Sequence, residues 1–158
     1  MVTMVNQRNK ALDLIKIIAI LSMVIDHLRY ILPEYQNILV TFGRWAFPFF
    51  AFLIAANTYR AIKLESYTTL KRYLVNLGIF SIISEIPYRL LVGSAGKPVD
   101  TLNVIPTLML GFLLILIVAS KVRFITKILL TLPFIICLYY FGHYLEYGIY
   151  GVMLMPLF

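Results

Sequence analysis

Long apolar runs separated by short polar connections dominate this chain of 158 residues. A helix needs about 20 mostly apolar residues to cross a hydrocarbon core of about 30 Å, because each residue adds about 1.5 Å. A sixth apolar run, 146–158, is shorter, and it is either half a span packed against its neighbours or the end of a truncated domain. The five runs that meet or approach the full length are 12–32, 38–57, 70–92, 103–120 and 124–142.

The connections between these runs are short, and short connections favour antiparallel neighbouring helices. We therefore predict an all-α fold, a polytopic transmembrane helix bundle of five to six spans, as a single integral membrane domain over residues 1–158. The composition supports a lipid surrounding: 61% of the residues are hydrophobic, 13% are charged, and the mean hydropathy is +0.90. A soluble domain has about 45–50% apolar and about 25% charged residues.

The net charge of +7 would suggest a nucleic-acid partner in a soluble protein. Here the positive-inside rule explains it, since cytoplasmic loops of membrane proteins carry excess lysine and arginine, and we expect no nucleic-acid partner. A cytoplasmic N-terminus leaves only Arg29, Arg44, Arg89 and Lys97 on the outer side. The basic residues then expected on the cytoplasmic side are Arg8, Lys10, Lys16, Arg60, Lys63, Lys71, Arg72, Lys121, Arg123 and Lys127.

The first run ends in an acid and an imidazole, Asp26 and His27, within "IIAILSMVIDHLRY" at 17–30. Ionisable groups inside spans are rare and mark functional candidates, whereas the same groups near a span end reach the interface easily. An imidazole titrates near neutral pH and can act as a general base. Adjacent helix residues point about 100° apart, so Asp26 need not touch His27. A catalytic pair and an interfacial pair are equal interpretations of these two residues.

Two cations belong to the same region of the sequence. Lys16 precedes His27 by about three helical turns, which places both on one helix face about 16 Å apart. On spacing alone, a snorkelling lysine at the cytoplasmic end is the favoured interpretation of Lys16. Arg44 lies at the start of the second run, followed by Pro48, which is expected to kink the helix. Arg44 would clamp an anionic group, pair with Asp26, or simply snorkel.

The third and fourth runs add two more polar candidates. Glu85 stands four residues before Arg89, an ion-pair spacing that favours a structural role. Asn103 opens the fourth run, where it either starts the helix or points into a cavity. On the predicted topology these groups, with His143 and Glu146, share the outer ends of their spans, which predicts a pocket opening outward. The tyrosines beside Glu146 favour an interfacial anchor for that last cluster.

No metal site is predicted. The two histidines are far apart and the acids are scattered, which is unlike the ligand spacing of zinc sites. The single cysteine, Cys137, excludes an internal disulfide and a cysteine-based cluster, and it is expected to be a lipid-facing or packed thiol.

Several motifs together resemble a known family. The segments "LDLIKIIAILSMVIDH" (12–27), "FGRWAFPFFAFLIAANTYR" (42–60), "LN" (102–103) and "YGIYGVMLM" (147–155) occur in the order seen in the TraX family. Its members are multi-pass proteins of the bacterial inner (cytoplasmic) membrane associated with N-terminal acetylation of conjugative pilin. The first run also resembles acyltransferase family three, in which a basic residue, usually arginine, precedes an essential histidine by ten intervening residues. Lys16 and His27 have that spacing here.

The resemblance implies that an acetyl group moves from acetyl-CoA to an amine, such as a pilin-like N-terminus, or to a hydroxyl acceptor. By analogy, His27 would deprotonate the acceptor, Asp26 would orient or tune His27, and Lys16 or Arg44 would contact anionic parts of the donor. The candidate substrate-binding residues are Glu85 and Asn103. The alternatives are a small proton- or ion-coupled transporter and a non-catalytic membrane assembly partner. The largely apolar middles of the spans disfavour transport.

Overall fold

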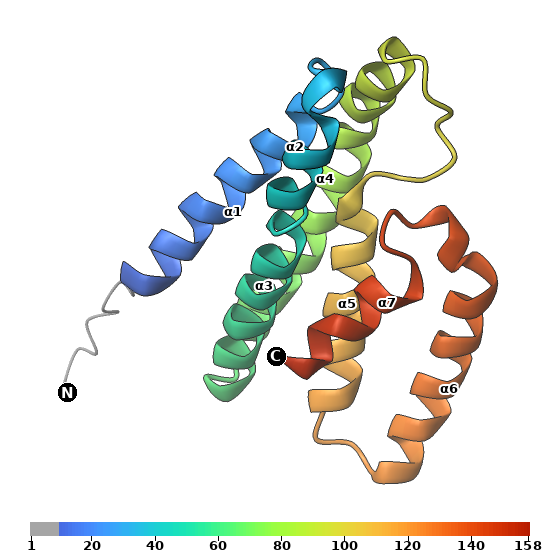
Figure 1. Ribbon diagram of the computed structural model, residues 1–158. Helices are drawn as coiled ribbons and strands as arrows, with labels where there is room; N and C mark the ends of the chain where they lie inside the picture. The colour runs from blue at the N-terminus through green and yellow to red at the C-terminus, as the bar shows by residue number, and fades with distance from the viewer. Residues whose placement is uncertain (1–9) are drawn as a thin grey trace.

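The computed structural model describes residues 10–158 (Figure 1), so the predicted cytoplasmic position of Arg8 lies outside the described residues. The described chain is helical, and one isolated bridge between Leu102 and Leu145 is its only strand-like pairing. Three 3-10 segments, at 33–35, 142–144 and 155–157, extend or connect the helices. The α-helices are α1 (Lys10–Leu28), α2 (Gln36–Gly43), α3 (Ala46–Lys63), α4 (Tyr67–Ser94), α5 (Val104–Ala119), α6 (Phe124–Phe141) and α7 (Gly148–Leu154).

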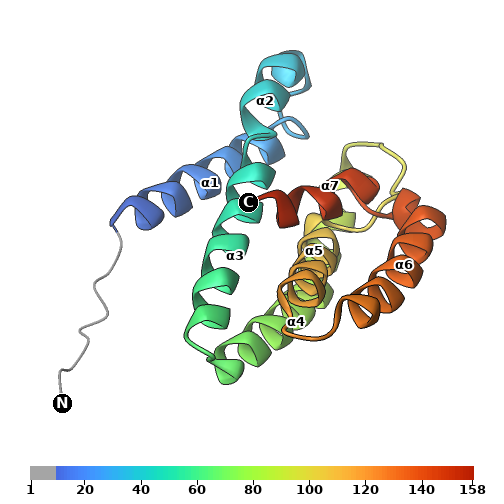
Figure 2. The same ribbon diagram turned by 90° about the horizontal axis from the view of Figure 1, so that it is seen from below.

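Helix α5 is the centre of the packing. Figures 1 and 2 show it between α3, α4, α6 and α7, while α1 leans away on the side of α3. Phe112 of α5 is fully buried in a cluster that includes Ala51 and Ala55 of α3 and Met155 near the C-terminus. The small alanine side chains let the α3 backbone approach α5 closely, the usual basis of helix association in membranes.

The apolar helices indicate a membrane protein, and the number of spans remains a prediction. α1 has 19 residues but carries Asp13, Lys16 and Asp26. The segments long and apolar enough to cross a membrane are Pro33–Lys63, Tyr67–Ser94 and Phe124–Tyr144, and shorter apolar helices occupy Val104–Ala119 and Gly148–Leu157.

The outer faces of α4 and α6 are apolar and exposed. Ile82 of α4 is 75% exposed and Leu129 of α6 is 66% exposed, and similar side chains continue along both helices. Exposed apolar surface on this scale is unusual for a protein in water. These faces are suited to contact with lipid tails.

Two prolines in the apolar segments, Pro48 and Pro87, affect their helices differently. Near Pro48 the expected interruption occurs, because α2 ends at Gly43 and α3 begins at Ala46. Proline lacks the N–H that would bond the Arg44 carbonyl one turn earlier, which explains the break. Pro87 does not end its helix, since α4 continues to Ser94.

The connections alternate between two ends of the bundle. At one end, Lys97 donates a hydrogen bond to Gln36 (3.4 Å), and the Leu102 amide donates to the Tyr144 carbonyl (2.8 Å). We call this the pocket end; it carries the connections after α1, α4 and α6. The opposite end, which we call the basic end, carries the connections after α3 and α5. This alternation is the arrangement expected of antiparallel neighbours.

An ion pair joins the two connections of the basic end. Lys121 Nζ lies 2.5 Å from Glu65 Oε1. The hydrogen bond from Lys121, with its charge, lowers the pKa of the Glu65 carboxyl, and Glu65 in turn raises the pKa of Lys121. Both side chains are exposed, so the pair contributes little stability. The pair shows that the connections 63–66 and 120–123 lie side by side.

Candidate functional site

Four charged side chains from three parts of the sequence meet at the pocket end. Arg29 Nη2 lies 3.4 Å from Asp26 Oδ2 and 3.9 Å from Glu146 Oε1. Arg44 Nε lies 3.9 Å from Asp26 Oδ1, and Arg44 Nη1 lies 3.8 Å from Glu146 Oε1. We call Asp26, Arg29, Arg44 and Glu146 the charge cluster. Two cations facing two anions balance the charge of a largely buried group, which is what burial requires.

Three parts of the fold hold the charge cluster, because Arg29 directly follows the helix that carries Asp26. Asp26 lies in the last turn of α1, and Arg44 lies in the break between α2 and α3. Glu146 lies in the turn before α7. Gly43 brings the first two together, because a Cβ at Gly43 would lie 2.5 Å from the Asp26 Cα. No side chain fits between these two backbones, so glycine sets the close approach of α1 and α2.

The Tyr147 ring completes the side of the site formed by α3 and α7. It stacks on Phe47 with ring centroids 3.9 Å apart, and the Arg44 guanidinium lies 5.2 Å above its centroid. Gly151, one turn later in α7, makes room for this stack, since a Cβ there would lie 3.1 Å from the Phe47 ring. Aromatic stacking and a cation over a ring both favour one fixed position of α7.

His27 forms a hydrogen bond within its own helix, α1. Its Nδ1 lies 2.7 Å from the Met23 carbonyl oxygen. A carbonyl oxygen only accepts hydrogen bonds, so Nδ1 carries the proton in this contact and Nε2 of the neutral ring keeps a free lone pair. No hydrogen bond or ion pair joins Asp26 to His27 in residues 10–158; Asp26 is buried and His27 is exposed. Any tuning of His27 by Asp26 therefore acts without a hydrogen bond.

A cavity of about 550 Å³ brings several predicted residues together. Asp26, His27, Asn103 and Glu146 all line it. The remaining wall is mostly apolar or aromatic and comes from α1, α3, α4 and α5. A mostly apolar cavity with a few convergent polar groups is the usual form of a small-molecule site. The structure therefore forms a pocket from most of the polar groups expected to share one end.

Glu85 and Asn103 connect α4 to the start of α5 through hydrogen bonds. Asn103 Nδ2 donates to Glu85 Oε2 (2.6 Å) and to the Ser81 carbonyl (2.9 Å), while Asn103 Oδ1 caps α5 by accepting from the Ile105 amide (2.9 Å). Glu85 Oε1 also accepts from Arg89 Nε at 2.7 Å. Through these bonds both residues hold α4 against α5. Their role in substrate binding stays a prediction.

The other predicted residues lie outside the cavity wall. Lys16 Nζ lies 3.1 Å from Asp13 Oδ1 on an exposed turn of α1. Arg44 is absent from the wall but contacts two residues that form it, Asp26 and Glu146. His143 is exposed and packs against Tyr144 with ring centroids 3.9 Å apart.

The sequence interpretation missed two members of this site. Arg29 was counted only as an outer basic residue, although its position three residues after Asp26 is an ion-pair spacing on a helix. Tyr147 was interpreted as part of an aromatic anchor. No local pattern indicates its stacking on Phe47, because the two residues lie a hundred positions apart.

Comparison with known proteins gives one match. No curated protein and no solved structure matches the chain. The family described as TraX protein matches residues 11–158, nearly the whole chain, and this protein therefore belongs to the TraX family.

Proposed function

We propose that this protein is an integral membrane acetyltransferase that uses His27 as its general base. The observation that carries the proposal is the hydrogen bond from His27 Nδ1 to the Met23 carbonyl, which leaves Nε2 available beside a 550 Å³ cavity. A fixed tautomer with a free ring nitrogen is the form that a general base needs. Membership of the TraX family supports the same reaction, because resemblance to that family implies pilin processing in conjugation.

The reaction is a direct transfer without an acyl-enzyme. The acceptor, an amine such as a pilin-like N-terminus or a hydroxyl, attacks the carbonyl carbon of the acetyl thioester. A C–N or C–O bond forms, the C–S bond breaks, and the coenzyme A thiolate leaves. His27 Nε2 takes the proton lost by the acceptor and returns it to the thiolate. Cys137 is no alternative nucleophile, because it lines a different cavity on α6.

The donor is acetyl-CoA, whose phosphates require cations. Lys16 lies on α1 about three turns before His27, a separation of about 16 Å along the helix. This separation suits a donor held by its phosphates toward the basic end and extended toward the histidine. The spacing also supports a relation to acyltransferase family three. Arg44 is 40% exposed and contacts two residues of the cavity wall, so it retains access to a ligand.

The acceptor side of the cavity includes Asn103, supported by Glu85. Asp26 is a positioning residue in this proposal, since it holds α1 against Arg29 and Arg44. We place the protein in the bacterial inner membrane with a cytoplasmic N-terminus and five to six spans. The basic end, with Lys121, would then face the cytoplasm and the cavity would face outward.

Acetyl transfer in proteoliposomes tests the proposal. Purified protein is given acetyl-CoA labelled in the acetyl group and an acceptor peptide with a free N-terminus. His27→Ala should lower transfer by about 10²- to 10⁴-fold, the usual contribution of a general base. His143→Ala is the matched control, because His143 is exposed and outside the cavity. Unchanged transfer in His27→Ala, or no binding of acetyl-CoA by the wild type, would refute the proposal.

Cysteine labelling tests the orientation. In a Cys137→Ser background, Lys97→Cys at the pocket end should react with a membrane-impermeant maleimide in intact cells. Lys121→Cys at the basic end should react only after permeabilisation. The reverse pattern would invert the topology.

A proton-coupled transporter is the second candidate, and one feature favours it. Among residues 10–158, Asp26 Oδ1 has no hydrogen-bond partner and is buried at the cavity. A carboxylate in that state is a candidate proton carrier. The test is whether the protein acidifies the interior of proteoliposomes. Acidification that is lost in Asp26→Asn, in a protein that transfers no acetyl group, would favour transport over catalysis.

A further inference from the structure

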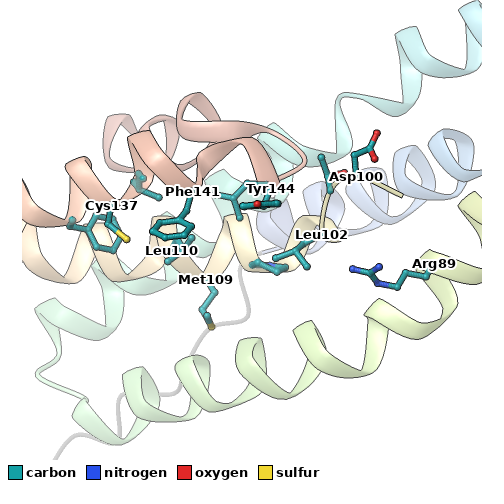
Figure 3. Close-up of a pocket in the computed structure, with 13 residues that line it drawn as sticks. Arg89, Asp100, Leu102, Met109, Leu110, Cys137, Phe141 and Tyr144 are labelled. Carbon is teal, nitrogen blue, oxygen red and sulfur yellow. The ribbon is translucent and has the colours of Figure 1, made fainter. Parts of the chain in front are cut away.

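A second cavity, separate from the one that contains His27, lies between α4, α5 and α6. Its volume is about 380 Å³. Figure 3 shows Met109 and Leu110 of α5 beside Cys137 and Phe141 of α6, with Arg89 of α4 near one end of the cavity. Two of its three helices, α4 and α6, belong to the segments long enough to cross a membrane. The proposed acetyl transfer makes no use of this cavity.

The walls of this cavity are hydrocarbon over most of their area. Pro106, Met109 and Leu110 come from α5, and Phe134 and Leu138 come from α6. Water has few partners in such a space and does not fill it well. The outer faces of α4 and α6 are apolar and exposed. In a membrane, an acyl chain would therefore be the apolar group available to occupy this cavity.

The polar groups of the cavity gather toward the pocket end. Arg89 Nε donates to Glu85, and the terminal N–H groups of Arg89 have no hydrogen-bond partner in the part of the chain that the structure describes. The Arg89 side chain is 51% exposed. Asp100 is exposed on the connection between α4 and α5 and also lines the cavity. We call this end of the cavity the rim. It carries one cation, Arg89, which is paired with Glu85, and one anion, Asp100, and Arg89 and Asp100 are not paired with each other.

The connection that carries Asp100 is fixed on both sides. Tyr88 of α4 and Thr101 share a hydrogen bond of 3.1 Å between their hydroxyl groups. The Leu102 amide donates to the Tyr144 carbonyl beyond α6 at 2.8 Å. The connection is therefore anchored to α4 and to the segment that follows α6.

We propose that this cavity binds a membrane aminophospholipid of the phosphatidylethanolamine type. One acyl chain lies between α5 and α6, the phosphate meets the terminal N–H groups of Arg89, and the ammonium meets Asp100. A zwitterionic headgroup complements a rim with one charge of each sign. Guanidinium and phosphate form a strong, directional pair, and the apolar walls exclude a free phosphate as the whole ligand.

Photo-crosslinking tests the position of the acyl chain. The purified protein is delipidated, reconstituted with a phosphatidylethanolamine that carries a diazirine in one acyl chain, and irradiated, and adducts are mapped by mass spectrometry. Adducts should concentrate on the cavity-facing residues of α5 and α6, including Phe134. Cys137→Trp, which fills the cavity, should abolish this concentration, whereas Ile136→Trp should preserve it because Ile136 is exposed but outside the wall. Adducts spread evenly over α6, or unaffected by Cys137→Trp, would overturn the proposal.

Competition tests the headgroup. Unlabelled phosphatidylethanolamine should displace the probe about tenfold better than diacylglycerol with the same chains, the effect of about one charge-assisted hydrogen bond. Phosphatidylglycerol should compete less well than phosphatidylethanolamine, and Asp100→Asn should remove that difference. Inorganic phosphate alone should not compete. Equal competition by all three lipids in the wild type, or displacement by inorganic phosphate, would overturn the headgroup assignment. Size-exclusion profiles establish that each variant remains folded.

Discussion

Replacing Arg29 by glutamine should destabilise the protein more than the same replacement at Arg44. Both arginines face Asp26 and Glu146 at similar distances, so distance alone predicts equal effects. Their surroundings differ, because the Arg29 side chain is 10% exposed and the Arg44 side chain is 40% exposed. Exposure lets solvent screen Arg44, and burial leaves Arg29 dependent on its partners.

The expected loss of stability follows from the ion-pair distances and from the burial of each pair. At an effective dielectric constant of about 20, a unit-charge pair at the 3.4 Å between Arg29 and Asp26 is attracted by about 5 kcal/mol before desolvation. Removing one partner of a buried pair typically costs about 3–5 kcal/mol, because the other charge stays buried. An exposed pair contributes about 1 kcal/mol or less. We therefore expect a loss of about 3 kcal/mol for Arg29→Gln and about 1 kcal/mol for Arg44→Gln.

Unfolding by dodecyl sulfate in mixed micelles, followed by circular dichroism, measures both free energies. Arg29 Nη2 also donates to the Tyr30 hydroxyl at 2.8 Å, so Tyr30→Phe is the control for that bond. Equal losses in the two arginine variants, or a larger loss for Arg44→Gln, would refute the reasoning from burial. A loss in Tyr30→Phe as large as that in Arg29→Gln would assign the effect to the hydrogen bond instead.

Two further variants test how the helices are held together. Gly43→Ala should destabilise the bundle by at least about 1–3 kcal/mol because its Cβ would lie 2.5 Å from the Asp26 Cα, whereas Gly93→Ala in open space should be neutral or stabilising by up to about 1 kcal/mol. Thermal unfolding compares them, and a stable Gly43→Ala would contradict the close approach. Asn103→Ala should cost about 2–4 kcal/mol by losing the cap of α5 and the bonds to Glu85. Asn103→Ser should recover about 1 kcal/mol through the cap, and equal losses in both variants would contradict that role.

The sequence predicted the helices well because membrane helices must be continuous and apolar. The runs 103–120 and 124–142 differ from α5 and α6 by one residue or less at each end. The run 38–57 was a poorer prediction, because the break at 44–45 divides it between two helices. Hydropathy does not detect such a break, since the residues on both sides of Arg44 are apolar. The proline at position 48 was the local signal.

The site could be predicted only in part. Periodicity places Asp26 and His27 in different directions, and the structure shows the first buried and the second exposed. It does not reveal that Glu146 meets Arg29 and Arg44, because these ion pairs depend on where the turn before α7 lies in the folded bundle. Equally, a polar residue such as Asn103 has the same sequence signature whether it caps a helix or binds a ligand.

The different orientations of Asp26 and His27 lead to a final prediction, that the two adjacent residues have separable roles. Asp26 is buried against two arginines, so Asp26→Asn should lower the free energy of unfolding by about 3 kcal/mol. His27 is exposed, and it forms a hydrogen bond to a carbonyl of its own helix. His27→Ala should therefore change the free energy of unfolding by less than about 1 kcal/mol while acetyl transfer falls. Parallel measurements of unfolding and transfer on both variants test this. A His27→Ala protein that is as unstable as Asp26→Asn would assign His27 to the structure of α1, because a residue whose role is chemical can be removed without loosening the fold.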